Sequence, residues 1–318
     1  MEDKVQLVNK IIENIERVII GKREAIELTL ISLMCEGHIL IEDVPGVGKT
    51  TLAAAIAKSI NVSFKRIQFT PDILPSDITG FSMYNQKTGE FEYKEGSVMS
   101  QFILADEINR TSPKTQASLL EVMEERQITV DGITHKVPSP FMVLATQNPV
   151  EYVGTFQLPE AQMDRFFMKM SIGYPTDESE SLMLTNFKEV NPLASLKPVA
   201  NSDDILELQK QVKKVYVDET INHYIIEIVQ QTRNHPDIAL GVSPRGSLNL
   251  YRAAQAWAFY EGRSYVIPDD VLKMASVVLS HRIVLKHEAR LKRVSILEII
   301  DSIIHKVRVP VVDNYEKK

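Results

Sequence analysis

This chain of 318 residues has only one cysteine, lacks long apolar runs and has no excess of positive charge. The single cysteine, Cys35, excludes an internal disulfide and a metal site built from clustered cysteines, and it favours a reducing compartment. No apolar run is long enough to span a membrane, and the first residues, Met1-Glu-Asp-Lys4, are unlike a signal peptide. We therefore expect a cytoplasmic protein without a membrane span.

The charge balance is mildly acidic, with 36 Lys and Arg against 42 Asp and Glu and a formal net charge of -6. This total gives no broad basic footprint for nucleic acid, although a local basic pore is compatible with it. The seven histidines show no spacing typical of metal ligands. His281 and His287 fall on a predicted basic helix, where we expect a solvated face.

The length and the apolar content predict a chain in two parts. The chain is slightly longer than the size at which a single hydrophobic core usually stops growing. Its hydrophobic residues, 44% of the total, are enough to form two cores. Up to Tyr174-Pro175, strand patterns alternate with helical ones, which predicts an α/β core with a parallel sheet flanked by helices in residues 1–175. The patterns in residues 176–318 are almost all helical, which predicts a second, helical domain.

The most specific motif is a glycine-rich segment, Pro45-Gly-Val-Gly-Lys49, between a predicted buried strand at 38–42 and a predicted helix at 50–59. Its glycines can bend a loop tightly around phosphate, where backbone N–H groups and the positive helix end bind the anion. In such a loop Lys49 reaches the β- and γ-phosphates and the Thr50 hydroxyl ligates Mg²⁺. The general pattern has a glycine where this chain has Asp43, so an ordinary glycine turn is the alternative.

Two adjacent carboxylates, Asp106 and Glu107, end the apolar run that begins at Phe102. This arrangement is expected where a buried parallel strand reaches the carboxyl edge of its sheet. There Asp106 would hold Mg²⁺ and Glu107 would orient or polarise an attacking water, which indicates a hydrolase rather than a kinase. Two solvated acids at a strand end are the alternative, and the upstream phosphate loop favours the catalytic interpretation.

Asn148 and Arg165 fit the same kind of site. Asn148 follows a third apolar strand, 141–146, and its amide can position water, although an Asn-Pro pair is also typical of a turn. Arg165 can pair locally with Asp164 or Glu160, or it can serve as an arginine finger for the ATP of a neighbouring subunit.

Arg245 occupies an unexpected position. Ser243 is a good N-cap and Pro244 suits the first helical position, so Arg245 lies in the first turn of a predicted helix. Because the helix dipole disfavours a cation there, a nearby anion would account for its placement. The γ-phosphate is the candidate anion, and a surface ion pair is the alternative.

Taken together, these segments resemble the MoxR family of AAA+ ATPases. The similarity spans nearly the whole chain and includes Val18 to Gly21, Glu42 to Thr50, Ala105 to Arg110, Ala145 to Pro149, Leu158 to Arg165 and Gly241 to Arg245. Asp43 is usual in this family, so its departure from the general pattern matters less. The resemblance implies a P-loop AAA+ core followed by an all-helical lid domain.

The resemblance also implies roles for individual residues. The nucleotide-binding Walker A segment comprises Val44, Pro45, Gly46, Val47, Gly48, Lys49, Thr50 and Thr51, and part of the adenine pocket comprises Val18, Ile19, Ile20 and Gly21. Asp106 and Glu107 resemble Walker B, with Thr50 and Asp106 as the Mg²⁺ ligands. Asn148 resembles sensor 1 and Arg245 resembles sensor 2. Arg165 resembles a finger that acts in trans, although another basic residue on the same edge, such as Arg110, could take that role.

Two predicted β-hairpins accompany these motifs. Residues 128–134 alternate around Asp131-Gly132, and residues 84–93 turn near Gly89. They resemble the family's hairpin before sensor 1 and its helix-2 insert. In a ring both hairpins could face the pore, and surface hairpins without substrate contact are the alternative.

The function that the resemblance implies is Mg²⁺-dependent ATP hydrolysis by a ring, expected to be a hexamer, that remodels or matures a protein client. Relatives of this family act with proteins that contain a von Willebrand factor A domain, which suggests such a partner. The alternatives are the motor subunit of a metal chelatase, a nucleotide-gated binding scaffold, and a DNA helicase whose ATPase rate would respond to DNA. Glu107 argues against the scaffold, because a protein that only senses nucleotide needs no acid to orient water.

Overall fold

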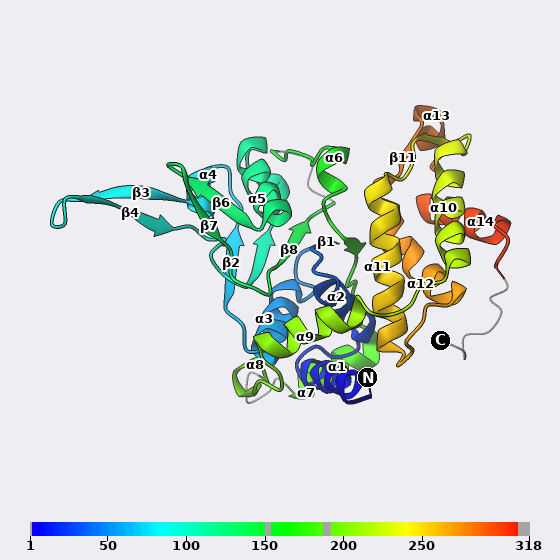
Figure 1. Ribbon diagram of the computed structural model, residues 1–318, viewed down its shortest axis with the longest axis horizontal. Helices are drawn as coiled ribbons and strands as arrows, with labels where there is room; N and C mark the ends of the chain where they lie inside the picture. The colour runs from blue at the N-terminus through cyan, green and yellow to red at the C-terminus, as the bar shows by residue number, and fades with distance from the viewer. Residues whose placement is uncertain (1, 150–153, 187–191, 311–318) are drawn as a thin grey trace.

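Five parallel strands form the centre of the fold, which a computed structural model describes for residues 2–149, 154–186 and 192–310 (Figure 1). Across the sheet the strands follow the order β2 (Phe64–Gln68), β5 (Phe102–Asp106), β8 (Met142–Gln147), β1 (Ile39–Glu42) and β9 (Met168–Met170). Each adjacent pair is parallel, so all five strands end at the same edge of the sheet. The predicted parallel α/β core is confirmed.

Helices cover both faces of the sheet, because alternate strand residues point to opposite sides. On β5, for example, Leu104 joins one buried cluster and Ile103 joins the other. The first face packs against α1 (Glu2–Glu16), α2 (Arg23–Met34) and α3 (Lys49–Ser59), and the second against α5 (Pro113–Glu125).

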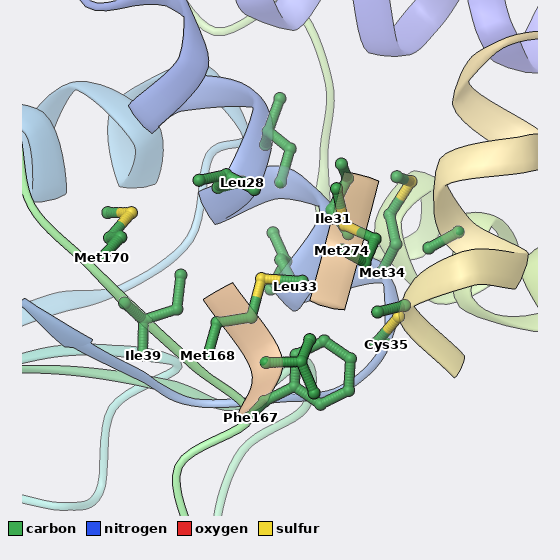
Figure 2. Packing of buried hydrophobic residues seen from close by; sticks show 14 of the residues in the cluster. Leu28, Ile31, Leu33, Met34, Cys35, Ile39, Phe167, Met168, Met170 and Met274 are labelled. Atoms are coloured by element: carbon green, nitrogen blue, oxygen red, sulfur yellow. The ribbon is translucent and has the colours of Figure 1, made fainter. Parts of the chain in front are cut away.

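The larger cluster continues from the sheet into the helical region. Figure 2 shows Ile31 of α2 close to Met274 of α12 (Pro268–Leu279), with Met168 of β9 nearby. The two apolar clusters therefore lie on the two faces of the sheet. The larger cluster spans both parts of the chain, because α2 packs against the sheet and the C-terminal helices at once.

The C-terminal region is helical, as predicted. Helices α10 (Glu219–Asn234), α11 (Pro244–Tyr260), α12 and α14 (Ile296–Lys306) pack together, with the short strands β10 (Ile238–Leu240) and β11 (Val284–Leu285) and helix α13 (His287–Leu291) beside them (Figure 1). Helix α9 (Ser202–Val212) packs on α2, where Gln209 Nε2 donates to the main-chain oxygen of Leu33 at 2.8 Å. The domain boundary near residue 175 stays a prediction. The remaining short helices are α4 (Pro75–Thr79), α6 (Glu160–Met163), α7 (Asp177–Asn186) and α8 (Pro192–Ser195), with 3-10 helices at Ile108–Arg110 and Ser280–Arg282.

Both predicted hairpins are present. Strands β6 (Gln127–Val130) and β7 (Ile133–Lys136) pair across Asp131 and Gly132, whose φ angles of 50° and 79° suit a tight two-residue turn. Strands β3 (Gly80–Asn85) and β4 (Glu90–Glu95) form the other hairpin, which projects far from the body of the molecule in Figure 1.

One expectation about the helical region was wrong. His281 is 8% exposed, and its Nε2 lies 3.1 Å from the main-chain oxygen of Phe166, so it is a buried residue and not part of a solvated face. His287 is exposed, as expected. Among the helices of the described residues, none has both the length and the apolar character to cross a lipid bilayer.

Candidate nucleotide site

The glycine-rich loop joins the end of β1 to the start of α3. Gly46 and Gly48 have φ angles of 89° and 90°, which favour glycine, and a Cβ atom added to either would meet nothing within 4 Å. Lys49 begins α3, so the unpaired N–H groups of the first helical turn lie at the loop. Lys49 Nζ donates to the main-chain oxygens of Asp43 at 2.9 Å and Val44 at 3.3 Å, which holds the amine inside the loop. An open loop, a helix N-terminus and an amine in this arrangement fit a phosphate group.

Asp43 has a structural reason to replace the glycine of the general pattern. Its side chain is buried, and the carboxylate accepts hydrogen bonds from Ser171 Oγ at 2.8 Å, from Gly173 N at 3.2 Å and from the N–H of Ile172. These three residues follow β9. Asp43 therefore ties the start of the phosphate loop to the segment that leaves the last strand of the sheet.

Asp106 lies at the end of β5 and is 8% exposed. Its Oδ1 accepts from Thr146 Oγ1 on β8 at 2.6 Å, and its Oδ2 accepts from Arg66 Nη2 on β2 at 2.7 Å. The Arg66 side chain is 47% exposed, so this ion pair is open to water on the arginine side. Asp106 thus presents a carboxylate at the carboxyl edge of the sheet.

Glu107 has a φ angle of 58°, the left-handed region that is uncommon for residues other than glycine and concentrates at functional sites. Its N–H donates to Thr146 Oγ1 at 2.9 Å, so one hydroxyl contacts both acids. Its Oε2 accepts from Gln68 Nε2 at 2.9 Å and lies 3.3 Å from Arg110 Nε. These contacts fix the direction of the second carboxylate.

Asn148 directly follows β8 and is 6% exposed. Strands β1, β8 and β5 are neighbours in the sheet, and their carboxyl ends lie at one edge. The phosphate loop, Asn148 and the pair Asp106-Glu107 therefore follow three adjacent strands at that edge. The catalytic role of each residue stays a prediction.

Arg165 and Arg245 meet at a different carboxylate. Arg165 Nε lies 3.0 Å from Glu124 Oε2, and Arg245 Nη2 donates to the other oxygen of the same carboxylate. Arg245 lies in the first turn of α11, where Ser243 Oγ accepts from Gly246 N at 3.3 Å, so the predicted N-cap is confirmed. Glu124 is the partner of both arginines, whereas the local alternative for Arg165 was a pair with Asp164 or Glu160.

Asp164, the residue before Arg165, joins the sheet to the helical region. Its Oδ2 accepts from Ser243 Oγ at 2.9 Å, and its Oδ1 accepts from Arg282 Nε at 2.9 Å. Arg282 is 4% exposed and also donates to the main-chain oxygen of Phe166 at 2.5 Å. Asp164 is adjacent to Arg165 in the sequence, and Ser243 is two residues before Arg245. The position of Arg245 beside Arg165 therefore depends on the contacts that Asp164 makes with Ser243 and with the buried Arg282.

The residues predicted near adenine divide between the core and a cavity. Val18 and Ile19 belong to the buried apolar cluster, and Ile20 is half-buried. Gly21 lines a cavity of about 680 Å³ whose walls include residues of α2, β9 and α12. Glu42 and Lys169 also line this cavity and form an ion pair, with 2.9 Å between Lys169 Nζ and Glu42 Oε2. A role in binding adenine stays a prediction for this segment.

Three residues at the site were missed from the sequence. Thr146 lies inside the Ala145-Thr-Gln-Asn148 segment, and its contact with both acids follows from the pairing of β5 with β8. Arg66 and Gln68 lie on β2, and the register places Gln68 beside Asp106. The signal available was that Arg66 and Gln68 are polar, lie two positions apart on that strand and therefore share one face of it.

The comparisons with known proteins agree with this arrangement. The model of the ATPase family associated with various cellular activities (AAA) matches residues 38–168, and the AAA lid domain model matches residues 230–303. The chain is 39% identical to Chaperone MoxR1 of Mycobacterium tuberculosis, over 98% of this chain and 84% of that protein. The chain belongs to the MoxR family of AAA+ ATPases.

Two other similar proteins extend over nearly the whole of this MoxR-family chain. YeaC of Bacillus subtilis is 53% identical over 98% of this chain and 97% of its own length. The crystal structure of a candidate ATPase from Cytophaga hutchinsonii has a TM-score of 0.91 and 41% identity, and the match covers 97% of this chain and 96% of that one. The family resemblance seen in the motifs is confirmed.

Proposed function

We propose that this MoxR-family chain hydrolyses ATP in a Mg²⁺-dependent reaction and that it works as a ring, expected to be a hexamer. The observation that carries the proposal is that the phosphate loop, Asn148 and the pair Asp106-Glu107 follow three neighbouring parallel strands. Open α/β sheets bind ligands at the carboxyl ends of their strands. A site built there from an amine, two carboxylates and an amide suits phosphoryl transfer to water.

The residues present fit a Mg²⁺ ion bound together with nucleotide phosphates. Thr50 provides a hydroxyl at the first turn of α3, and Asp106 provides a carboxylate. Among the described residues, no group of three or more His, Cys, Asp or Glu side chains is arranged to hold a metal by itself, which suits an ion that shares its ligands with phosphate. The Arg66 side chain is half-exposed and can turn away from Asp106 into solvent. When bound, the ion would neutralise charge on the phosphates.

Glu107 is the proposed residue that orients the attacking water. Its left-handed backbone and its contacts with Gln68 and Arg110 fix where the carboxylate points. Asn148 would hold the same water from the neighbouring strand, since an amide positions water without taking its proton.

Arg165 and Arg245 are proposed to act on the ATP of a neighbouring subunit. The two guanidinium groups share the carboxylate of Glu124, whereas Lys49 contacts the carbonyl groups of its own loop. Arg165 and Arg245 therefore form a pair of cationic side chains around Glu124, and the two guanidinium groups can bind one phosphate together. Such a shared site requires a ring with heterologous contacts between subunits.

The use of the hydrolysis is proposed to be the remodelling or maturation of a protein client in the cytoplasm. The name of Chaperone MoxR1 supports a chaperone-like role. The projecting β3–β4 hairpin supports client contact, because Phe81, Tyr84 and Phe91 on it are 49%, 52% and 75% exposed. A protein with a von Willebrand factor A domain is the proposed partner.

The test is the Mg²⁺-ATPase rate per subunit across a wide range of protein concentration, for the native chain, for Arg165→Ala, for Glu107→Gln and for a mixture of these two variants. We expect the native rate to rise with concentration and each variant to be inactive alone. In a mixed ring, an R165A subunit supplies Glu107 and an E107Q subunit supplies Arg165, so about a quarter of the interfaces regain both groups.

The mixture decides between shared and separate sites. Recovery of activity in the mixture supports a site built by two subunits. A native rate that is independent of concentration, together with no recovery in the mixture, would contradict the ring.

A further inference from the structure

Glu124 is the one charged residue that contacts both Arg165 and Arg245 in the described part of the chain, and the motifs assign it no role. We propose that its carboxylate holds, in the separate subunit, the two guanidinium groups that bind the terminal phosphate of a neighbour's ATP in the ring. Ring assembly on nucleotide then requires that the phosphate displaces Glu124. The inference rests on the proposed function, because it needs Arg165 and Arg245 to act on a neighbouring subunit.

The contact lies in a cavity rich in guanidinium groups. The cavity has a volume of about 280 Å³, and its lining includes Arg126, Arg165, Arg245 and Arg252 with the two acids Glu36 and Glu124. Glu36 pairs with Arg126 at 2.6 Å and also with Lys213. Glu36 therefore pairs with basic residues on one side of the cavity. Glu124 is the acid that faces the other side, where Arg165 and Arg245 lie.

Glu124 and Arg245 each lie at a helix end whose dipole disfavours the charge of the side chain. Glu124 lies in the last turn of α5, where no basic residue is present and the helix dipole disfavours an anion. Arg245 lies in the first turn of α11, where the dipole disfavours a cation. Across the contact each charge faces the helix end that favours it. The pair therefore stabilises a local arrangement that neither helix favours by itself.

A phosphate can replace this carboxylate. The side chains of Glu124, Arg165 and Arg245 are 36%, 31% and 40% exposed, so their ion pairs are screened by water and individually weak. A γ-phosphate carries more negative charge and several acceptor oxygens, and guanidinium groups bind phosphate with bidentate geometry. The exchange is therefore favourable. Its cost is the loss of two weak ion pairs, which corresponds to roughly a tenfold weakening of assembly.

The test is the protein concentration at which the ATPase rate per subunit is half-maximal, measured for the native chain, for Glu124→Gln and for Glu125→Gln. Glutamine has nearly the same shape as glutamate and lacks its charge, so it competes poorly with phosphate. We expect the half-maximal concentration to fall about tenfold in E124Q. Glu125 is exposed and adjacent on α5, so E125Q controls for a general change in surface charge and should match the native chain.

The outcomes separate this inference from the proposed function. An unchanged or higher half-maximal concentration in E124Q, while the native rate still rises with concentration, overturns the role of Glu124 and leaves the shared site intact. A native rate that does not depend on concentration overturns the role of Glu124 in assembly, and it overturns the shared site as well where the mixture of R165A and E107Q recovers no activity. A purely structural role for Glu124 predicts a lower melting temperature of E124Q together with a higher half-maximal concentration, which is the opposite sign.

Discussion

Asp164 and Arg282 form an ion pair between the sheet and the helical region, with 2.9 Å between Asp164 Oδ1 and Arg282 Nε. The Arg282 side chain is 1% exposed and that of Asp164 is 19% exposed. Burial lowers the pKa of the Arg282 guanidinium to about 10, and the Asp164 carboxylate opposes that shift. The guanidinium therefore stays charged at neutral pH and needs its partner.

Removing that partner should destabilise the protein. We expect Asp164→Ala to lower the free energy of unfolding by about 3 kcal/mol, because it leaves a buried charge uncompensated. Urea denaturation measures the effect. Glu160→Ala is the control, since Glu160 is an exposed acid on the adjacent helix α6 and should change stability by less than about 0.5 kcal/mol. If D164A lowers the free energy of unfolding by no more than E160A does, the pair of Asp164 and Arg282 is not important for stability.

The phosphate loop and the second acid should have separable roles. Lys49→Ala should weaken ATP binding by about 10- to 100-fold, because it removes a charged hydrogen-bond donor to phosphate. Glu107→Gln should still bind ATP while its hydrolysis rate falls by about 100-fold or more. Titration with a fluorescent ATP analogue and a phosphate-release assay measure the two quantities.

The control for both variants is Lys65→Ala, which removes an exposed lysine on β2. It should leave binding and hydrolysis near the native values. Equal loss of ATP binding in K49A and E107Q would contradict the division of roles.

The sheet was predictable because its strands carry continuous apolar runs. β5 is buried at all five positions and β8 at five of its six, so period and length indicated parallel strands between helices. The β6–β7 hairpin was predictable from Asp131-Gly132, since few dipeptides adopt two successive positive φ angles. These features depend on local sequence.

The contacts of the arginines were not predictable, because they join segments that are distant in the sequence, and that of Arg245 also depends on how the helical region docks on the α/β core. Arg165 and Glu124 are 41 residues apart by number, and Arg245 comes from another helix. The same docking buries His281 against Phe166, although a basic stretch of sequence indicated a solvated face. Charge patterns along one helix do not report which face a distant segment will cover.

Asp43 should influence both stability and ATP binding. In Asp43→Asn an amide group faces the N–H groups of Ile172 and Gly173, so a buried donor loses its acceptor. We expect a loss of about 1–3 kcal/mol in the free energy of unfolding. Because the main-chain oxygen of Asp43 also accepts from Lys49, the affinity for ATP should fall as well.

Ser171→Ala is the matched comparison for Asp43. It removes one hydrogen bond to the carboxylate and keeps the charge, so we expect a loss of about 1 kcal/mol and little change in ATP affinity. Thermal melting and isothermal titration measure the two effects. If D43N binds ATP as tightly as S171A does, Asp43 does not set the shape of the loop.

His38 should make stability depend on pH in the acidic range. Its Nδ1 accepts from Val143 N at 3.0 Å, so its Nε2 carries the hydrogen and donates to the main-chain oxygen of Met123 at 3.0 Å. Burial lowers the pKa of this imidazole to about 4, whereas an unfolded histidine titrates near 6.5. Between these values the unfolded chain binds a proton that the folded chain does not, so the free energy of unfolding falls as the pH falls.

The effect of His38 should be absent above pH 6.5 and should reach about 3 kcal/mol at pH 4. His38→Gln keeps a side chain that can accept from Val143 and donate to Met123, and it cannot take up a proton. Subtracting its pH profile of urea stability from the native profile removes the groups that both proteins share, including the buried His281. A difference that increases from pH 4 to 6.5 and then levels off is the expected result, with His287→Gln, an exposed histidine, as the control. A flat difference across this range would show that His38 is protonated as readily in the folded chain as in the unfolded one.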